Sequence, residues 1–352
     1  MQLRDKWLKS LSKKYGYEHE KNREIVDESV KILEDIYCSF VNSEQSDNKF
    51  ISQILKGKNR QYEQAMGEML FWDVLNKHSF KLCSNNGKGP DFHFILNDLD
   101  IYCELITPEV DGKGIIEKHN QDINTRIVAG ARRTQEQDKE IFLRITSALK
   151  AKNEKYNNDK LNGIITENAI CIIVINDALL CPEDLPMLGV SHSSDWGSPP
   201  YVARATLNRN NNLKNNNGRN IPTDGFLSDK LSNISAVMQV TLRDDYGYAK
   251  TLVSLENEEF LRISGMIKDF DIVINQNAKE RLPDFIFKMN HWSLSNAGDL
   301  IVQKVVSKAT LEDVARHLNL QRKMFGLEEI PLIELKAKLT SQSSRPPTAT
   351  AD

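Results

Sequence analysis

The chain contains 352 residues, of which 40% are apolar and 27% are charged, and its 46 basic side chains nearly balance 49 acidic ones. This length allows two or three ordinary domains or one elaborated domain, with ample apolar residues for a buried core. The net charge of −3 excludes a histone-like basic protein and provides no global attraction for nucleic acid.

No segment approaches the ~18 consecutive apolar residues that a membrane span requires. The N-terminus is charged throughout, and the five cysteines are scattered, odd in number and mostly placed within apolar runs. This cysteine usage is typical of reduced thiols. We therefore expect a cytoplasmic protein that does not contact a membrane.

The first half of the chain predicts helices followed by strands. Apolar residues recur at helical spacing from Ile25 to Phe40, and a second helix is expected over 62–77 after the polar stretch 42–49. Strands are then expected near 80–84, over 90–97 and over 101–108, the last two joined by an Asn-Asp-Leu-Asp turn. A charged helix up to 156 precedes a continuous apolar run, 169–176, which indicates a strand covered on both faces.

The second half of the chain predicts an extension of this core. Residues 181–225 look like loop and contain an Asn-rich segment, 206–220, expected to be a mobile insertion. A further strand is expected over 234–242 and a helix over 309–325. The expected organisation is thus a helical N-terminal region (1–60), a core (61–180), its extension (181–335) and a disordered tail (336–352).

Three acidic residues in the core carry the functional hypothesis. On a helix, Glu68 has Phe71, Trp72 and Leu75 as neighbours, and a carboxylate on an apolar face is costly unless it is paired or coordinated. The alternative is a glutamate at the edge of that face that reaches solvent. Gly67 beside it would allow close approach to another element.

Alternation of side chains places Asp91 and Glu104 on the same face of an antiparallel hairpin. Glu104 lies in an otherwise apolar strand and needs a partner, and two carboxylates on one face are suitable ligands for a hard divalent cation. The alternative is a coincidence between an exposed turn acid and an acid on the sheet face.

These residues resemble the PD-(D/E)xK, or restriction-endonuclease-like, nuclease superfamily. The resemblance consists of a helical Glu, a Gly-Pro-Asp-Phe that opens a strand and a Glu in the next strand, and it covers residues 60–178. It implies an α/β fold with an αβββαβ core. It also implies that Glu68, Asp91 and Glu104 bind Mg (or Mn) and act in metal-assisted hydrolysis of DNA or RNA.

The sequence departs from the family pattern at one position. The family's lysine, two residues after the second acid, is replaced here by Ile106, which can neither orient water nor neutralise a phosphate. The segment 143–156 resembles a basic helix found after the core acids in divergent members, with Arg144, Lys152, Lys155 and Tyr156 at its recognisable positions. Lys152 is then the expected catalytic replacement, and Arg144 and Lys155 are expected to contact substrate. The alternative is a solvated charged helix face.

Two functions therefore remain open at the level of sequence. The first is a metal-dependent nuclease, and the second is a binding or assembly module that keeps the nuclease fold without catalysis. A helical scaffold with an unrelated pocket would follow only if 90–107 did not form a hairpin. The partner expected for a nuclease is nucleic acid, and the sequence leaves open whether the chain forms a homodimer or a larger complex.

Overall fold

The computed structural model describes the greater part of the chain. The described residues are 3–17, 20–43, 45–58, 60–77, 80–83, 89–109, 135–180, 199–209, 214–215, 217–255, 271–283, 290–295, 299–303 and 328–343, with 312, 315, 316 and 319. No helix in these ranges is long and apolar enough to cross a membrane.

Helices form the N-terminal region, as predicted. They are α1 (Leu3–Tyr15), α2 (Glu20–Asn42), α3 (Asn48–Lys56) and α4 (Arg60–Lys77). Helix α3 is absent from the prediction, because the polar stretch 42–49 indicates only a break. The Asp47 carboxylate caps this helix by accepting a hydrogen bond from the Phe50 N–H at 2.6 Å, and Phe50 and Ile54 are buried.

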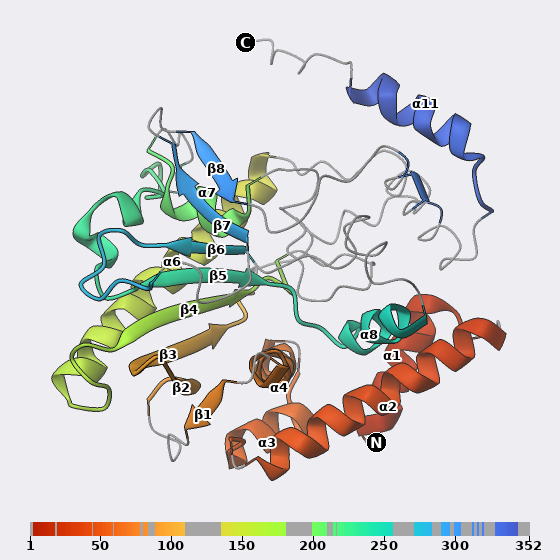
Figure 1. Cartoon of the computed structure of the whole chain (residues 1–352), viewed down its shortest axis with the longest axis horizontal. Helices are drawn as coiled ribbons and strands as arrows, with labels where there is room; N and C mark the ends of the chain where they lie inside the picture. Colours follow the sequence, from red (N-terminus) through yellow and green to blue (C-terminus); the bar gives the residue numbers. More distant parts are fainter. Residues whose placement is uncertain are drawn as a thin grey trace.

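The strands form one mixed sheet whose spatial order repeats the chain order (Figure 1). Strands β1 to β3 are antiparallel neighbours, β4 and β5 run parallel to β3, and β6 to β8 complete the sheet with antiparallel, parallel and antiparallel pairings. The strands are β1 (Lys81–Cys83), β2 (Phe92–Leu96), β3 (Leu99–Ile106), β4 (Ile170–Asn176), β5 (Ala236–Val240), β6 (Asp271–Ile274), β7 (Asn290–Leu294) and β8 (Leu300–Gln303). The predicted α/β class is confirmed, and each predicted strand is present.

A two-residue loop fixes the register of the β2–β3 hairpin. Asn97 and Asp98 have φ angles of 50° and 61°, a left-handed conformation that Asn and Asp tolerate better than most residues. The loop pairs Leu96 with Leu99 and places Phe92 opposite Cys103. The predicted hairpin is therefore confirmed. The alternative of a helical scaffold with an unrelated pocket required that 90–107 form no hairpin, so it no longer applies.

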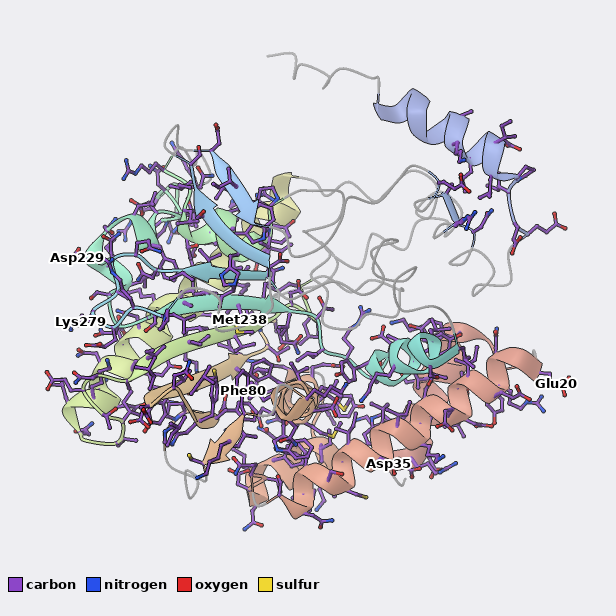
Figure 2. The ribbon with its side chains drawn as sticks, viewed as in Figure 1. Glu20, Asp35, Phe80, Asp229, Met238 and Lys279 are labelled. Carbon is purple, nitrogen blue, oxygen red and sulfur yellow. The ribbon has the colours of Figure 1, made fainter. Side chains whose placement is uncertain are left out.

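The sheet separates two apolar cores. Phe71 of α4 packs with Phe92 and Leu105 on one face, and Tyr102 and Ile173 lie in the core on the other face. Helix α6 (Gln135–Leu161) packs against β4 on this second face, and α7 (Tyr201–Thr206) packs against β5 and β6. In Figure 2, Met238 of β5 lies inside the molecule, whereas Glu20 and Asp35 of α2 lie at its outer surface.

A buried tyrosine fixes α6 against the sheet. The Tyr156 hydroxyl donates a hydrogen bond to the Ile172 carbonyl of β4 at 2.8 Å, and the side chain is 1% exposed. Because α6 connects β3 to its parallel neighbour β4, this bond sets which residues of α6 face the end of β3.

Two parts of the C-terminal half contradict the sequence prediction. Helix α7 lies within 181–225, which was expected to be loop, and its buried Tyr201 and Val202 pack into the second core. Helix α11 (Leu332–Ser343) covers the first part of the 336–352 tail, so that the prediction of disorder is wrong for 336–343. Most of 309–325 and all of 344–352 lie outside the described residues.

The remaining described elements are short. Two 3₁₀ turns (Gly225–Leu227 and Asp229–Leu231) precede β5, and α8 (Tyr246–Leu255) follows it. In the Asn-rich segment, Lys214 and Asn220 form an antiparallel bridge around a turn, although 210–213 and 216 lie outside the described residues.

Gly67 permits the close approach of α4 to the sheet that the sequence predicts. A Cβ atom at this position would lie 2.8 Å from Asn176 Nδ2 and 3.1 Å from a methyl carbon of Leu105. Asn176 is held in place, since its amide donates to the Leu242 carbonyl at 3.1 Å and accepts from the Leu242 N–H at 2.9 Å. The Asn176 side chain therefore cannot move away from an added Cβ atom without losing these hydrogen bonds.

We predict that Gly67→Ala lowers the free energy of unfolding by about 1–3 kcal/mol because of this overpacking. Helix propensity alone predicts the opposite sign, a gain of about 0.5–1 kcal/mol. Urea unfolding of the two proteins distinguishes the effects, and a more stable variant would show that α4 and the sheet do not approach so closely.

Candidate active site

Glu104 is the most deeply buried of the three predicted acids. It lies in β3 with 4% of its surface exposed, on the face covered by α6. A buried carboxylate requires compensation for its lost hydration. Lys152 pairs with its Oε1 atom and Lys155 Nζ lies 2.6 Å from its Oε2 atom, so that both oxygens are in ion pairs.

Asp91 lies immediately beside Glu104. The β2–β3 register pairs Phe92 with Cys103, so the next position along each strand places Asp91 opposite Glu104. The Leu105 N–H donates a hydrogen bond to Asp91 Oδ2 at 2.8 Å, which fixes the aspartate at the start of β2. The predicted placement of both carboxylates on one face follows from this register.

Glu68 lies in the same cleft on α4, and a hydrogen bond from Gln64, a residue absent from the sequence-based prediction, holds it there. The Gln64 amide donates to Glu68 Oε1 and to the Leu105 carbonyl, both at 2.9 Å. Its carbonyl oxygen accepts from the Thr107 N–H at 2.8 Å. Gln64 therefore joins Glu68 to the end of β3. A glutamine four residues before a glutamate on a helix is the sequence signal for this contact.

The carboxylates interact electrostatically. Burial raises the pKa of Asp91 well above its usual value, and the nearby Glu104 and Glu68 raise it further. Burial also raises the pKa of Glu68, with Glu104 adding to the rise, while the hydrogen bond from Gln64 and the charge of Lys49 oppose it. The charges of Asp91 and Glu68 are thus disfavoured by burial and by acidic neighbours, and a cation bound beside them would stabilise them.

A cleft of about 660 Å³ contains these groups. The three predicted acids, Lys152 and Ile106 belong to its lining, which also includes basic and amide side chains from α3 and the start of α4. The full lining is Lys49, Gln53, Lys58, Arg60, Gln61, Gln64, Glu68, Asp91, Glu104, Leu105, Ile106, Glu109 and Lys152. The basic residues of α3 and α4 cannot be identified from the sequence, because only the tertiary fold brings them to the acids.

The three predicted basic residues of α6 have different positions. Lys152 lines the cleft and pairs with Glu104. Lys155 pairs with the same carboxylate, and its Nζ atom lies 3.4 Å from the Gly89 carbonyl, but it is not part of the lining. Arg144 is paired with Glu140 at 2.9 Å and does not line the cleft. The structure therefore does not bring Arg144 to the acids, because it lies eight residues, or about 12 Å of helix, before Lys152.

The donor set suits a hard divalent cation with few protein ligands. Within the described residues, no three acidic, histidine or cysteine side chains lie close enough together to enclose a metal ion, so the expected three-carboxylate ligand set is not assembled. Mg²⁺, however, commonly takes one or two carboxylates and keeps several water molecules. Asp91 and Glu104 fit that requirement, with Glu68 held nearby by Gln64.

Comparisons with protein-family models, curated proteins and solved structures find no match to this chain.

We predict that Gln64→Ala lowers the free energy of unfolding by about 1–3 kcal/mol, because the buried Thr107 N–H and the Leu105 carbonyl each lose a partner. Denaturant unfolding measures the change. Gln61→Ala, an exposed position on the same helix and in the same cleft, should stay within about 0.5 kcal/mol of the parent protein. Equal effects of the two substitutions would contradict the bridging role of Gln64.

Proposed function

We propose that this chain is a metal-dependent nuclease of PD-(D/E)xK type that hydrolyses phosphodiester bonds of DNA or RNA. The observation that carries the proposal is the convergence of Asp91, Glu104 and Lys152 at the end of the β2–β3 hairpin. The element order supports it, since α4, the antiparallel β1–β3, α6 and the parallel β4 follow the αβββαβ order of that superfamily.

Asp91 and Glu104 would hold Mg or Mn, with Glu68 adding negative charge at the same place. When bound, the cation would lower the pKa of a coordinated water and stabilise charge that develops on the phosphate. Because Glu104 is buried, few bulk water molecules would compete with its carboxylate for the cation. Gln64 would keep the Glu68 carboxylate oriented toward the end of β3.

Lys152 would take the role that Ile106 cannot perform. Its ammonium reaches Glu104 from α6, on the opposite side of the acid from the α4 helix. There it would orient the attacking water and stabilise phosphate charge by a direct hydrogen bond. Lys155, which contacts Glu104 and the Gly89 carbonyl outside the cleft lining, would hold the carboxylate in place.

A catalytically inactive nuclease-fold module is the second candidate. It is favoured by the pairing of both Glu104 oxygens with lysines, which gives the carboxylate full compensation without a metal ion. The two candidates differ in whether the protein cleaves nucleic acid at all and, if it does, whether cleavage requires Glu104 and Lys152.

We predict that Glu104→Gln reduces Mg- or Mn-dependent cleavage by at least ~100-fold, because loss of a metal ligand removes several kcal/mol of transition-state stabilisation. The assay uses single- and double-stranded DNA and RNA with the full chain. Glu109→Gln, which removes a different acid from the same cleft, should change the rate less than about threefold.

The outcomes of this assay separate the two candidates. Equal cleavage by the parent protein and by Glu104→Gln would exclude the proposed site. Absence of cleavage on all four substrates with either metal would favour the inactive module.

We also predict that Lys152→Met lowers kcat by about 10²–10³ while Mg²⁺ affinity stays the same or increases. Affinity would increase because the substitution removes a cation that competes for Glu104. Rates and calorimetric Mg²⁺ titrations measure the two effects, and Lys150→Met provides an exposed control on the same helix. A variant that cleaves as fast as the parent would show that Lys152 does not replace the missing lysine.

A further inference from the structure

Three basic side chains border the acidic cleft on the side opposite α6. Lys49 belongs to α3, Lys58 to the connection that follows it, and Arg60 to the first turn of α4. All three are exposed. They are separated from the acids by at least eight residues of sequence and are brought to the cleft by the turn between α3 and α4.

Among the described residues, these three cations have fewer polar contacts than other basic residues near the sheet. Within the described part of the chain, the side chains of Lys49, Lys58 and Arg60 form no ion pair or hydrogen bond. Lys152 and Lys155, by contrast, both pair with Glu104. An anion that binds on the α3–α4 side would therefore not have to displace a carboxylate of the described residues from these cations.

The lining as a whole contains four basic and four acidic side chains. Among the acids Glu104 is buried, with 4% exposure, and Glu68, Asp91 and Glu109 are half-buried, whereas the α3–α4 cations are exposed at the rim. An anion approaching the cleft therefore meets positive charge first. Lys49 also lies within electrostatic range of Glu68, since it opposes the rise in the pKa of that residue.

We propose that Lys49, Lys58 and Arg60 form a phosphate-binding rim that holds the backbone of a single-stranded nucleic acid across the cleft, with Lys152 on the far side. This inference rests on the proposed nuclease function and adds the substrate class to it. A strand crossing from the rim to Lys152 places a phosphodiester over Asp91 and Glu104.

The dimensions of the cleft favour a single strand over a duplex. A volume of about 660 Å³ accommodates a short stretch of flexible backbone. A duplex carries its phosphates on the outside of two paired strands, so a cleft of this volume cannot take it in whole, whereas one unpaired strand can place a phosphate near the buried Glu104. A single strand can bend into the cleft, since its backbone is not constrained by base pairing.

The test is fluorescence anisotropy with a labelled single strand of about 12 nucleotides, in EDTA, over a range of salt concentrations. The variant carries Lys49→Gln, Lys58→Gln and Arg60→Gln. It should bind at least tenfold more weakly at low salt. The slope of log K against log salt should fall by about two, since each phosphate contact on a single strand contributes about 0.7.

A charge-matched control carries Lys31→Gln, Lys56→Gln and Lys150→Gln, all exposed positions outside the cleft lining. It should bind within about threefold of the parent protein. Equal losses in the two triple variants would overturn the proposal, because binding would then depend on diffuse charge. Tighter binding of a duplex of equal length, or displacement of the strand by inorganic phosphate at about 1 mM, would also overturn it.

The failure of this inference can be distinguished from the failure of the proposed function. Strand binding that requires the rim, without cleavage under any metal condition, would support the rim and contradict the nuclease. Cleavage with an unchanged KM in the rim variant would support the nuclease and contradict the rim.

Discussion

The ion pairs of Glu104 with Lys152 and Lys155 are the interaction on which the arrangement of the site depends. A carboxylate with 4% exposure in the middle of a sheet would destabilise the fold if left alone, and the lysines of α6 supply its counter-charge. Removing one partner of such a group typically costs about 3–5 kcal/mol, much more than a surface ion pair contributes. The position of α6 along β4 is therefore coupled to the pairing of a single carboxylate in β3.

A second constraint acts from the other face of the sheet. Gly67 lets α4 approach β3 closely. One turn earlier, the Gln64 side chain donates a hydrogen bond to the Leu105 carbonyl and accepts one from the Thr107 N–H. The site is thus assembled from two sides by different means. Backbone proximity and amide hydrogen bonds hold the α4 side, and charge pairing holds the α6 side.

Much of this arrangement could be predicted from the sequence, because local rules determine it. The alternation of side chains and the Asn-Asp turn predict the hairpin, and the hairpin register then places Asp91 beside Glu104. Lys152 could be proposed only through the resemblance, since charge on an exposed helix is usually solvated. Lys49, Lys58 and Arg60 could not be found, because their position depends on how α3 packs on α4, and no periodicity encodes that packing.

Arg144 does not line the cleft, for a geometric reason. A helix rises about 1.5 Å per residue, so that residues eight positions apart cannot both reach one carboxylate. The sequence prediction lacks helices α3 and α7 for another reason. They have nine and six residues, and their stability depends on the packing of their buried side chains more than on the local pattern that the sequence displays.

The agreement between chain order and strand order in the sheet has a consequence for how the protein forms during synthesis. Each strand emerges next to one that is already available for pairing, so the sheet can grow by addition at one edge without rearrangement. Glu104 emerges 48 residues before Lys152. For that interval the nascent hairpin carries an uncompensated acid; docking of α6 supplies its counter-charge, and pairing with β4 then makes β3 an interior strand.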